Sequence, residues 1–499
     1  MKKTFLLLFL SSWLFASTLH LATSTNPSRL NPILATDSSS AEIAGYIFNG
    51  LVKYDKDANK IISDLAEKFY FVDDKTLIFE LRKNVKWHDG AAFSAKDVLF
   101  TYQTLISDKI SSPYSSGFRF VKSVKILNPY KIQVNYKEPY FKALETWMMG
   151  ILPEHILKDE QNMMSSKFNT KPIGTGPYKL EQLEHSKNII LAAFDEYFEG
   201  RPRIDKISFH IIADATTRFL MLKSSQLDIG SVEPMAYERQ LKEEFFEKFK
   251  IYEKISLAYT YLGFNLRLEK FKDARVRKAL SLAIDRQEII DILFFNHASP
   301  CSGPFLPGSA AFNESVKVPT QDIQEALRLL KEAGYDEENP FSFEIVTSNS
   351  SSIRPYAAQI LQHQLKRAGV VVTLRVMEWQ AFLNMVVFPH KFDAVLLGWS
   401  LSPTPDPYVF WHSDSDKKGS FNLVGYNNPK MDKLIEESQS IIDRELLAKK
   451  WQKMFKMITD DNPYLFLYIP NSITAVDKDI KNIKPALGGI WHNYITWEK

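Results

Sequence analysis

The pattern of expected helices and strands changes near residue 264, and this change limits the possible folds more than any other feature. Before it, apolar and polar residues alternate, which is the period of a strand with one buried face. Ser94 and Asp97 form a capping box that begins a helix. Asn128-Pro129 makes the turn of an expected hairpin. The strands expected in this part are 18–23, 76–82, 122–126, 131–136, 189–193 and 206–212, with helices over 41–51 and from 216.

After residue 264, apolar residues recur at helical spacing between short strands. Asp285 and Thr320 are expected to cap two of the helices, and Gly334 and Gly369 to end two of them. Such βαβ alternation predicts a sheet layered with helices, so we expect an α/β protein. Its 499 residues are too many for one hydrophobic core, which indicates two or three domains. The strands expected here are 341–347, 370–376 and 393–398.

The N-terminus is typical of a secretory signal peptide. Lys2 and Lys3 give it a positive start, an apolar run follows over 4–15, and the small residues Ala16 and Ser17 come next. The run is about a dozen residues long, which is too short to span a bilayer. We therefore predict a signal peptide over residues 1–16 and an exported mature protein.

Cysteine content and charge exclude several further classes. Cys301 is the only cysteine, which rules out intramolecular disulfides and multi-cysteine metal sites. No cysteine stands at the end of the signal, so we expect no lipid anchor and place the protein in a Gram-negative periplasm. The net charge is 62 − 59 = +3, and this leaves no basic or acidic excess for nucleic acid or a charged membrane surface.

Motifs for catalysis are missing from the sequence. There is no phosphate loop, no dinucleotide-binding glycine pattern, no H-E-x-x-H and no G-x-S-x-G. Cys301 has no base near it in the sequence, so an ordinary unpaired thiol is favoured over a nucleophile. His88, His412 and His492 would hold a metal only if the fold brought them together. We predict no enzyme activity, no metal and no cofactor.

Residues 398–411 (GWSLSPTPDPYVFW) stand out as a candidate binding loop. Three prolines stiffen the backbone, and Asp406 is a single carboxylate among large rings. Rings around one carboxylate suit an ammonium group on an apolar body. The alternative is a loop packed on the core by Trp399 and Trp411, with Asp406 capping the next turn. Both interpretations stay open at this point.

Several blocks resemble the extracellular solute-binding proteins of the peptide and nickel import type, in order and spacing as well as in residues. They cover nearly the whole mature length, and together they are a strong signal although each alone is weak. The blocks are 46–55 (YIFNGLVKYD), 74–90 (DKTLIFELRKNVKWHDG), 93–98 (FSAKDV), 172–178 (PIGTGPY), 264–265 (FN) and 276–285 (VRKALSLAID).

The resemblance implies a two-lobed periplasmic binding protein of the Venus-flytrap type (cluster C, type II), with mixed sheets, flanking helices and an additional subdomain. The chain would cross between the lobes near Asn265 and near Asn471, and the lobes would close on a ligand about these crossings. The implied parts are a core of lobe I from 17–46, 174–263 and 472–499, an appended subdomain over 47–173, and lobe II over 264–471.

The sequence departs from part of this family at the ligand's ammonium group. The resemblance implies that dipeptide and oligopeptide binders hold this group with an Asp three residues after the strand-end Trp, and that position is Ser402 here. Asp406 either takes over the ammonium, or the ligand is not anchored by its N-terminus. We favour the first slightly. The predicted ligand-binding residues are Trp399 as a ring platform, Asp406 as the ammonium partner, and Ser402, Tyr408, Trp411 and Asn265.

The predicted function is capture of oligopeptides, or dipeptides, and delivery to the membrane permease of an ATP-driven importer, by a protein that acts as a monomer. A binder of a non-peptide solute, such as a nickel chelate or haem, is the alternative on the same fold. A secreted hydrolase and a holdase-like chaperone are two alternatives from other classes. No arginine stands out as the partner of a ligand carboxylate.

Overall fold

The computed structural model describes residues 16–57, 60–107, 110, 112–417, 421–486 and 489–499, so the predicted signal peptide lies outside it except for Ala16. These described residues form four sheets flanked by helices, and the expected α/β class is confirmed. Within the described residues, no helix combines the length and the apolar character that crossing a membrane requires.

The first sheet joins the start of the chain to its middle. Its strand order is β1-β10-β9-β8, and β1 pairs with β10 in parallel while the other pairs are antiparallel. Helix α1 (Ser38–Ile47) contacts this sheet through the ring of Tyr46, which meets Tyr178 and Phe209. The strands are β1 (Thr18–Thr23), β8 (Tyr178–Glu184), β9 (Asn188–Ala193) and β10 (Lys206–Ile211).

A second four-stranded sheet and a two-stranded ribbon form the part of the chain between residues 47 and 173. The expected hairpin and the capping box at Ser94 and Asp97 are both confirmed, and the box begins α2 (Ala95–Leu105). The sheet has the order β4-β5-β7-β6, and β2 pairs with β3. Their bounds are β2 (Val52–Tyr54), β3 (Ile61–Ser63), β4 (Ala66–Asp73), β5 (Thr76–Leu81), β6 (Val121–Asn128) and β7 (Lys131–Tyr136).

The largest sheet has eight strands and carries the predicted βαβ units. β15 pairs in parallel with both β16 and β17, as the alternation after residue 264 predicted. Helix α8 is fixed to β18 by Arg286, whose buried Nε donates to the Phe466 carbonyl at 2.6 Å. The strands are β11 (Ile229–Ser231), β12 (Phe249–Ile255), β13 (Ala258–Phe264), β14 (Ala298–Pro300), β15 (Ser342–Ser348), β16 (Val371–Met377), β17 (Ala394–Ser400) and β18 (Tyr464–Asp477).

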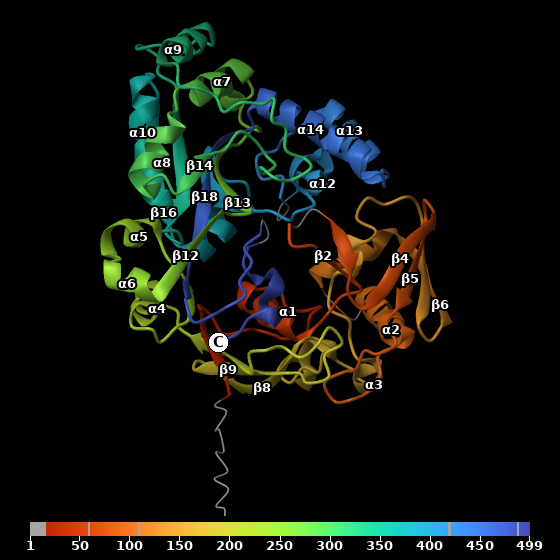
Figure 1. Cartoon of the computed structure of the whole chain (residues 1–499). Coiled ribbons are helices and arrows are strands. Elements are labelled where there is room, and N and C mark those ends of the chain that lie inside the picture. Colours follow the sequence, from red (N-terminus) through yellow and green to blue (C-terminus); the bar gives the residue numbers. More distant parts are fainter. Residues whose placement is uncertain (1–15, 58–59, 108–109, 111, 418–420, 487–488) are drawn as a thin grey trace, which may run out of the picture.

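Strand β18 connects the two halves of the molecule seen in Figure 1. The first part of β18 pairs with β13, and its last part pairs with β12. The chain therefore passes from β12 to β13 alongside β18. Ile255 lies opposite Asn471, and the Ser256 amide donates to the Pro470 carbonyl at 3.1 Å. In this view the lower half carries α1, β8 and β9, and the upper half carries α7 (Ala274–Leu282), α8 (Arg286–Phe294), α9 (Ile323–Glu332), α10 (Arg354–Arg367), α13 (Pro429–Gln439) and α14 (Arg444–Asp461).

The remaining helices confirm most of the expected starts and ends. Asp285 caps α8, but Asp322 rather than Thr320 caps α9, because its carboxylate accepts the Glu325 amide. The first helix runs over α1 instead of 41–51, because Asp37 caps it and Phe48 is extended. The α-helices are α3 (Glu154–Leu157), α4 (Ala215–Lys223), α5 (Pro234–Gln240), α6 (Glu243–Lys248), α7 (Ala274–Leu282), α8 (Arg286–Phe294), α9 (Ile323–Glu332), α10 (Arg354–Arg367), α11 (Trp379–Phe382), α12 (Pro407–Trp411), α13 (Pro429–Gln439) and α14 (Arg444–Asp461).

Candidate functional site

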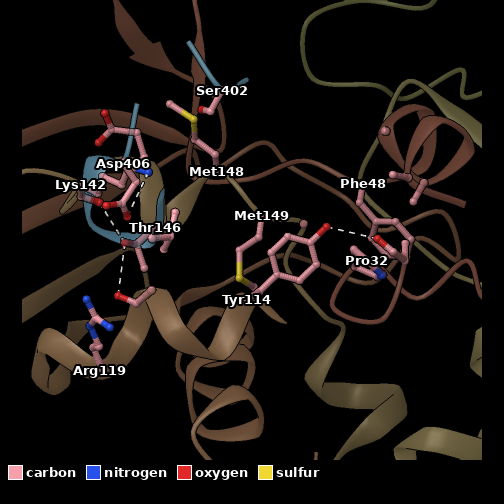
Figure 2. A pocket seen from close by; sticks show the side chains of 18 of the residues that line it. Pro32, Phe48, Tyr114, Arg119, Lys142, Thr146, Met148, Met149, Ser402 and Asp406 are labelled. Carbon is pink, nitrogen blue, oxygen red and sulfur yellow. Dashed lines mark hydrogen bonds and ion pairs between the residues drawn. The ribbon is translucent and has the colours of Figure 1, made fainter. Parts of the chain in front are cut away.

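A cavity of about 630 Å³ lies between three segments that are distant in the sequence. One wall comes from α1 and the loop before it, a second from residues 114–150, and the third from residues 402–409 of the proline-rich loop. Figure 2 shows Ser402, Asp406 and Lys142 toward one side and Pro32 and Phe48 toward the other. The lining residues are Pro32, Ala35, Ala41, Ala44, Gly45, Phe48, Tyr114, Gly117, Arg119, Tyr140, Lys142, Glu145, Thr146, Met148, Met149, Gly150, Ser402, Asp406 and Val409.

The charged groups of this cavity are of both signs. Lys142 Nζ lies 3.6 Å from an oxygen of Asp406, as the dashed line in Figure 2 marks. The guanidinium of Arg119 lies over the rings of Phe120 and Tyr408, at 4.7 and 5.8 Å from their centres. Glu145 supplies the second carboxylate. Two cations and two anions therefore line one partly apolar space.

Burial changes the acidity of Tyr140, one of the two tyrosines that line this cavity. Desolvation, followed by the negative charge of Asp406, raises the pKa of Tyr140 above its ordinary value. The phenol thus stays neutral at any physiological pH, and it presents a hydrogen-bonding group rather than a charge to the cavity.

A chain of hydrogen bonds joins the 47–173 part to the proline-rich loop and to the residues around α14. Tyr54 Oη donates to Thr404 Oγ1 at 3.0 Å, and Thr404 Oγ1 donates to Glu145 Oε1 at 3.0 Å. Arg444, at the start of α14, donates to the same Glu145 oxygen at 2.7 Å. The backbone amide of Phe141 adds a bond of 3.0 Å to the carbonyl of Gln439.

Two of the predicted ligand residues, Ser402 and Asp406, line the cavity. Asp406 also caps α12, because its Oδ1 accepts the Tyr408 amide at 3.2 Å. The two interpretations of this residue that the sequence left open are thus compatible, since the side chain caps a helix and faces the cavity. The capping bond and Lys142 together hold the carboxylate in place.

The predicted ring platform, Trp399, lies outside the lining of this cavity. Its indole stacks on Tyr261 with ring centres 6.1 Å apart, and Nε1 donates to Tyr464 Oη at 3.4 Å. Tyr408 stacks on His412 with ring centres 4.3 Å apart. Both rings are partly buried and stabilise the loop that carries Ser402 and Asp406. As ligand contacts, they stay predictions.

Trp411 and Asn265 are enclosed by protein. Trp411 is 2% exposed and packs between the rings of Tyr426 and Tyr464, so it belongs to the core and does not line the cavity. Asn265 is 4% exposed, and its Nδ2 donates to the carbonyls of Phe392 and His390 at 2.9 and 3.2 Å. Because both amide hydrogens are used inside the protein, Asn265 has none left for a ligand backbone.

Three charged residues of the cavity were missed by the sequence analysis, namely Arg119, Lys142 and Glu145. Arg119 lies in the 3₁₀ helix η1 (Pro113–Phe120) just before β6, and Lys142 and Glu145 lie in the turn and the 3₁₀ helix η2 (Glu145–Trp147) that follow β7. No periodicity marks a side chain in these short stretches as facing a site. Asp406 lies more than 250 residues further along the chain. No local signal in the sequence indicates this contact.

The residues considered for catalysis and metal binding are separated. His88 donates to the Gly176 carbonyl and accepts the Gly174 amide, and burial lowers its pKa to about 4. His412 stacks on Tyr408. Within the described part of the chain, no group of three or more His, Cys, Asp or Glu side chains is arranged to hold a metal ion. Cys301 is buried, and this burial raises the pKa of its thiol to about 12, far above the range of an active nucleophile.

Comparison with known proteins identifies a protein family whose model matches most of the chain. A family model described as "Bacterial extracellular solute-binding proteins, family 5 Middle" matches residues 60–421. The oligopeptide-binding protein AppA of Bacillus subtilis is 33% identical over 477 residues, which cover 92% of this chain and 87% of that protein. Its structure in complex with a nonapeptide has a TM-score of 0.81 and 31% identity, covering 96% of this chain and 98% of that one.

Relatives with other ligands are also similar. The structure of NikZ from Campylobacter jejuni in complex with Ni(L-His) has a TM-score of 0.82 and 27% identity, covering 97% of this chain and 99% of that one. Heme-binding protein A of Haemophilus influenzae is 24% identical over 469 residues, covering 89% of this chain and 85% of that protein. Similarity of fold therefore does not choose the ligand.

Proposed function

Because the chain belongs to family 5 of the bacterial extracellular solute-binding proteins, we propose that it captures oligopeptides in the cavity between residues 32–150 and 402–409. In this proposal the protein is not an enzyme but the binding component of an importer, and it delivers its ligand to a membrane permease. The volume of about 630 Å³ falls within the range of about 300–1,000 Å³ that is usual for sites of small ligands.

The observation that carries the peptide assignment is the mixed charge of the cavity. A peptide brings an ammonium group and a carboxylate, and each needs a partner of opposite sign when water is excluded. Glu145 and Asp406 offer negative charge, while Arg119 and Lys142 offer positive charge. A surface with charges of one sign only would favour a simple anion or cation instead.

The apolar part of the lining suits side chains of varied shape. Tyr114, Phe48, Met148 and Met149 supply rings and flexible thioethers, which adapt to different neighbours. Met148 and Met149 lie between the charged side and the Tyr114 ring in Figure 2. This combination supports binding without strict choice of sequence, as an importer for nutrient peptides requires.

A nickel chelate is the second candidate, since NikZ was solved with Ni(L-His). The lining residues of the cavity include neither His nor Cys, the side chains that bind nickel best. A chelate would therefore have to bring all nitrogen ligands of its metal with it. This feature favours the peptide.

We further propose the division of the chain that the resemblance implies, with one change. Asn471 on β18 lies opposite Ile255, so the neighbouring strand crosses between the lobes at residues 255–258 rather than near Asn265. The protein is proposed to be a periplasmic monomer that is made with a signal peptide over residues 1–16. The proposed parts are then 17–46, 174–257 and 472–499 for the core of lobe I, 47–173 for its subdomain, and 258–471 for lobe II.

Native mass spectrometry of the purified protein tests the peptide assignment. We expect it to retain short peptides from a random-sequence pentapeptide mixture, which denaturation then releases for identification. Ni(L-His) at the same concentration is the competing ligand. Retention of the chelate without peptides, or of neither, would contradict the proposal.

A variant without the two positive charges of the cavity tests whether the peptides bind there. Replacing Arg119→Gln and Lys142→Gln together should reduce the retained peptides at least tenfold, because a buried ligand carboxylate loses its partners. The matched control is Lys272→Gln, whose ammonium is exposed and pairs with Glu269 on the surface of the 264–471 part.

A further inference from the structure

Only one of the two carboxylate oxygens of Glu145 has a partner. Oε1 accepts hydrogen bonds from Thr404 and Arg444, at 3.0 and 2.7 Å. Oε2 is buried and has no hydrogen-bond partner among the described residues. The side chain as a whole is 9% exposed. A buried carboxylate oxygen without a donor loses its hydration and gains nothing in return, so such an oxygen usually receives a donor from a ligand or water.

Glu145 lines the cavity, so a ligand bound there could supply the missing donor. The residue begins η2, and it lines the cavity together with Lys142 on the same segment and with Ser402 and Asp406 on the opposite loop. One carboxylate oxygen is already held by the protein, and the buried second oxygen still lacks the donor that a cationic group of a ligand in this space would supply.

Asp406, the residue predicted for this role, is the weaker candidate in the structure. Its Oδ1 accepts the Tyr408 amide, and Lys142 lies 3.6 Å from its Oδ2. An arriving ammonium group would therefore meet the like charge of Lys142 and would have to displace it. At Glu145 the paired cation, Arg444, binds the other oxygen, Oε1.

We propose that Oε2 of Glu145 binds a primary ammonium group of the ligand, either its N-terminus or a lysine side chain. This inference rests on the proposed function and names the group that the cavity selects. Because Oε1 holds Thr404 and Arg444 from the 264–471 part, the ligand's ammonium joins the same carboxylate that closes the cavity. The binding of the ligand's ammonium group and the closure of the cavity are therefore coupled through the side chain of Glu145.

The test uses the full protein and an equimolar mixture of random-sequence pentapeptides, half of them acetylated at the N-terminus. Bound peptides are released by denaturation and identified by mass. The wild type is expected to enrich peptides with a free ammonium group at least tenfold over those without one. If Glu145 binds the ammonium group of a lysine side chain, the acetylated peptides that are retained should be rich in lysine. If it binds the N-terminal ammonium group, they should show no enrichment of lysine.

The variants assign this preference to one carboxylate. Glu145→Gln should lose the enrichment while still retaining acetylated peptides, which also shows that it is folded. Asp406→Asn should keep the enrichment. Equal retention of both halves by the wild type, without enrichment of lysine in either half, overturns the inference, and so does loss of the preference in Asp406→Asn alone. If neither half is retained by any form, the proposed function itself fails, and this outcome is distinct from the other two.

Discussion

At the scale of single residues, burial determines the chemistry of Cys301. The side chain is 1% exposed, and its thiol donates a hydrogen bond to the Gly303 carbonyl at 3.3 Å. Desolvation raises the pKa to about 12, so the thiol stays protonated at neutral pH. The nearby positive charge of Arg286 opposes this shift but does not cancel it.

The expected outcome is a thiol that does not react in the folded protein. Labelling with a chromogenic disulfide reagent should stay slow from pH 7 to pH 10, because the thiolate forms only near pH 12. In concentrated urea one thiol per chain should react at once. Cys301→Ser gives the background, and a native rate close to the unfolded rate would contradict the burial seen here.

At the scale of elements, the two glycines of the block 172–178 (PIGTGPY) are required because two backbones approach each other closely there. A Cβ on Gly174 would overlap the Ile47 carbonyl at the end of α1. The Gly176 amide donates to the same carbonyl at 2.8 Å, and His88 binds both glycines from the other side. The glycines thus connect the first sheet to the 47–173 part.

We expect Gly174→Ala to lower the free energy of unfolding by about 2 kcal/mol or more, because backbone cannot move aside as a flexible side chain can. Gly45→Ala is the control, since nothing lies within 4 Å of its added Cβ on α1. That change should be neutral or stabilise by about 0.5–1 kcal/mol. Urea unfolding measures both, and equal midpoints for the two variants would show that the approach at Ile47 is unimportant.

At the scale of the whole molecule, Thr404 and Arg444 of the 264–471 part bind Glu145 of the 47–173 part beside the cavity, and we expect these bonds to favour a closed form. Each is expected to contribute about 0.5–1.5 kcal/mol, so losing both should favour an open form by roughly five- to 150-fold. The double variant Thr404→Val, Arg444→Gln should therefore show a larger radius of gyration by X-ray scattering and a weaker affinity for peptides.

Arg328→Gln is the control for this variant, because Arg328 pairs with Glu325 and Glu332 on its own helix, α9. It should leave both the radius and the affinity unchanged. If the double variant scatters like the wild type and binds peptides equally well, closure does not depend on Glu145.

Local patterns predicted the elements well, because their causes are local. Ser94 and Asp285 cap helices through amides two or three residues away, and the hairpin over β6 and β7 needs only a turn between alternating strands. The errors were of the same local kind. Asp322 displaced Thr320 as a cap, since its carboxylate reaches the Glu325 amide.

The sequence by itself determined the α/β class, the order of the elements, the family and the loop that carries Ser402 and Asp406. All of these depend on patterns within short stretches of chain. The tertiary structure alone decided which side chains share the cavity. It placed Lys142 and Glu145 beside a loop more than 250 residues away, and it buried Trp411 and Asn265. Such contacts depend on how the sheets and helices pack against one another, and the local periodicity of the sequence carries no information about this packing.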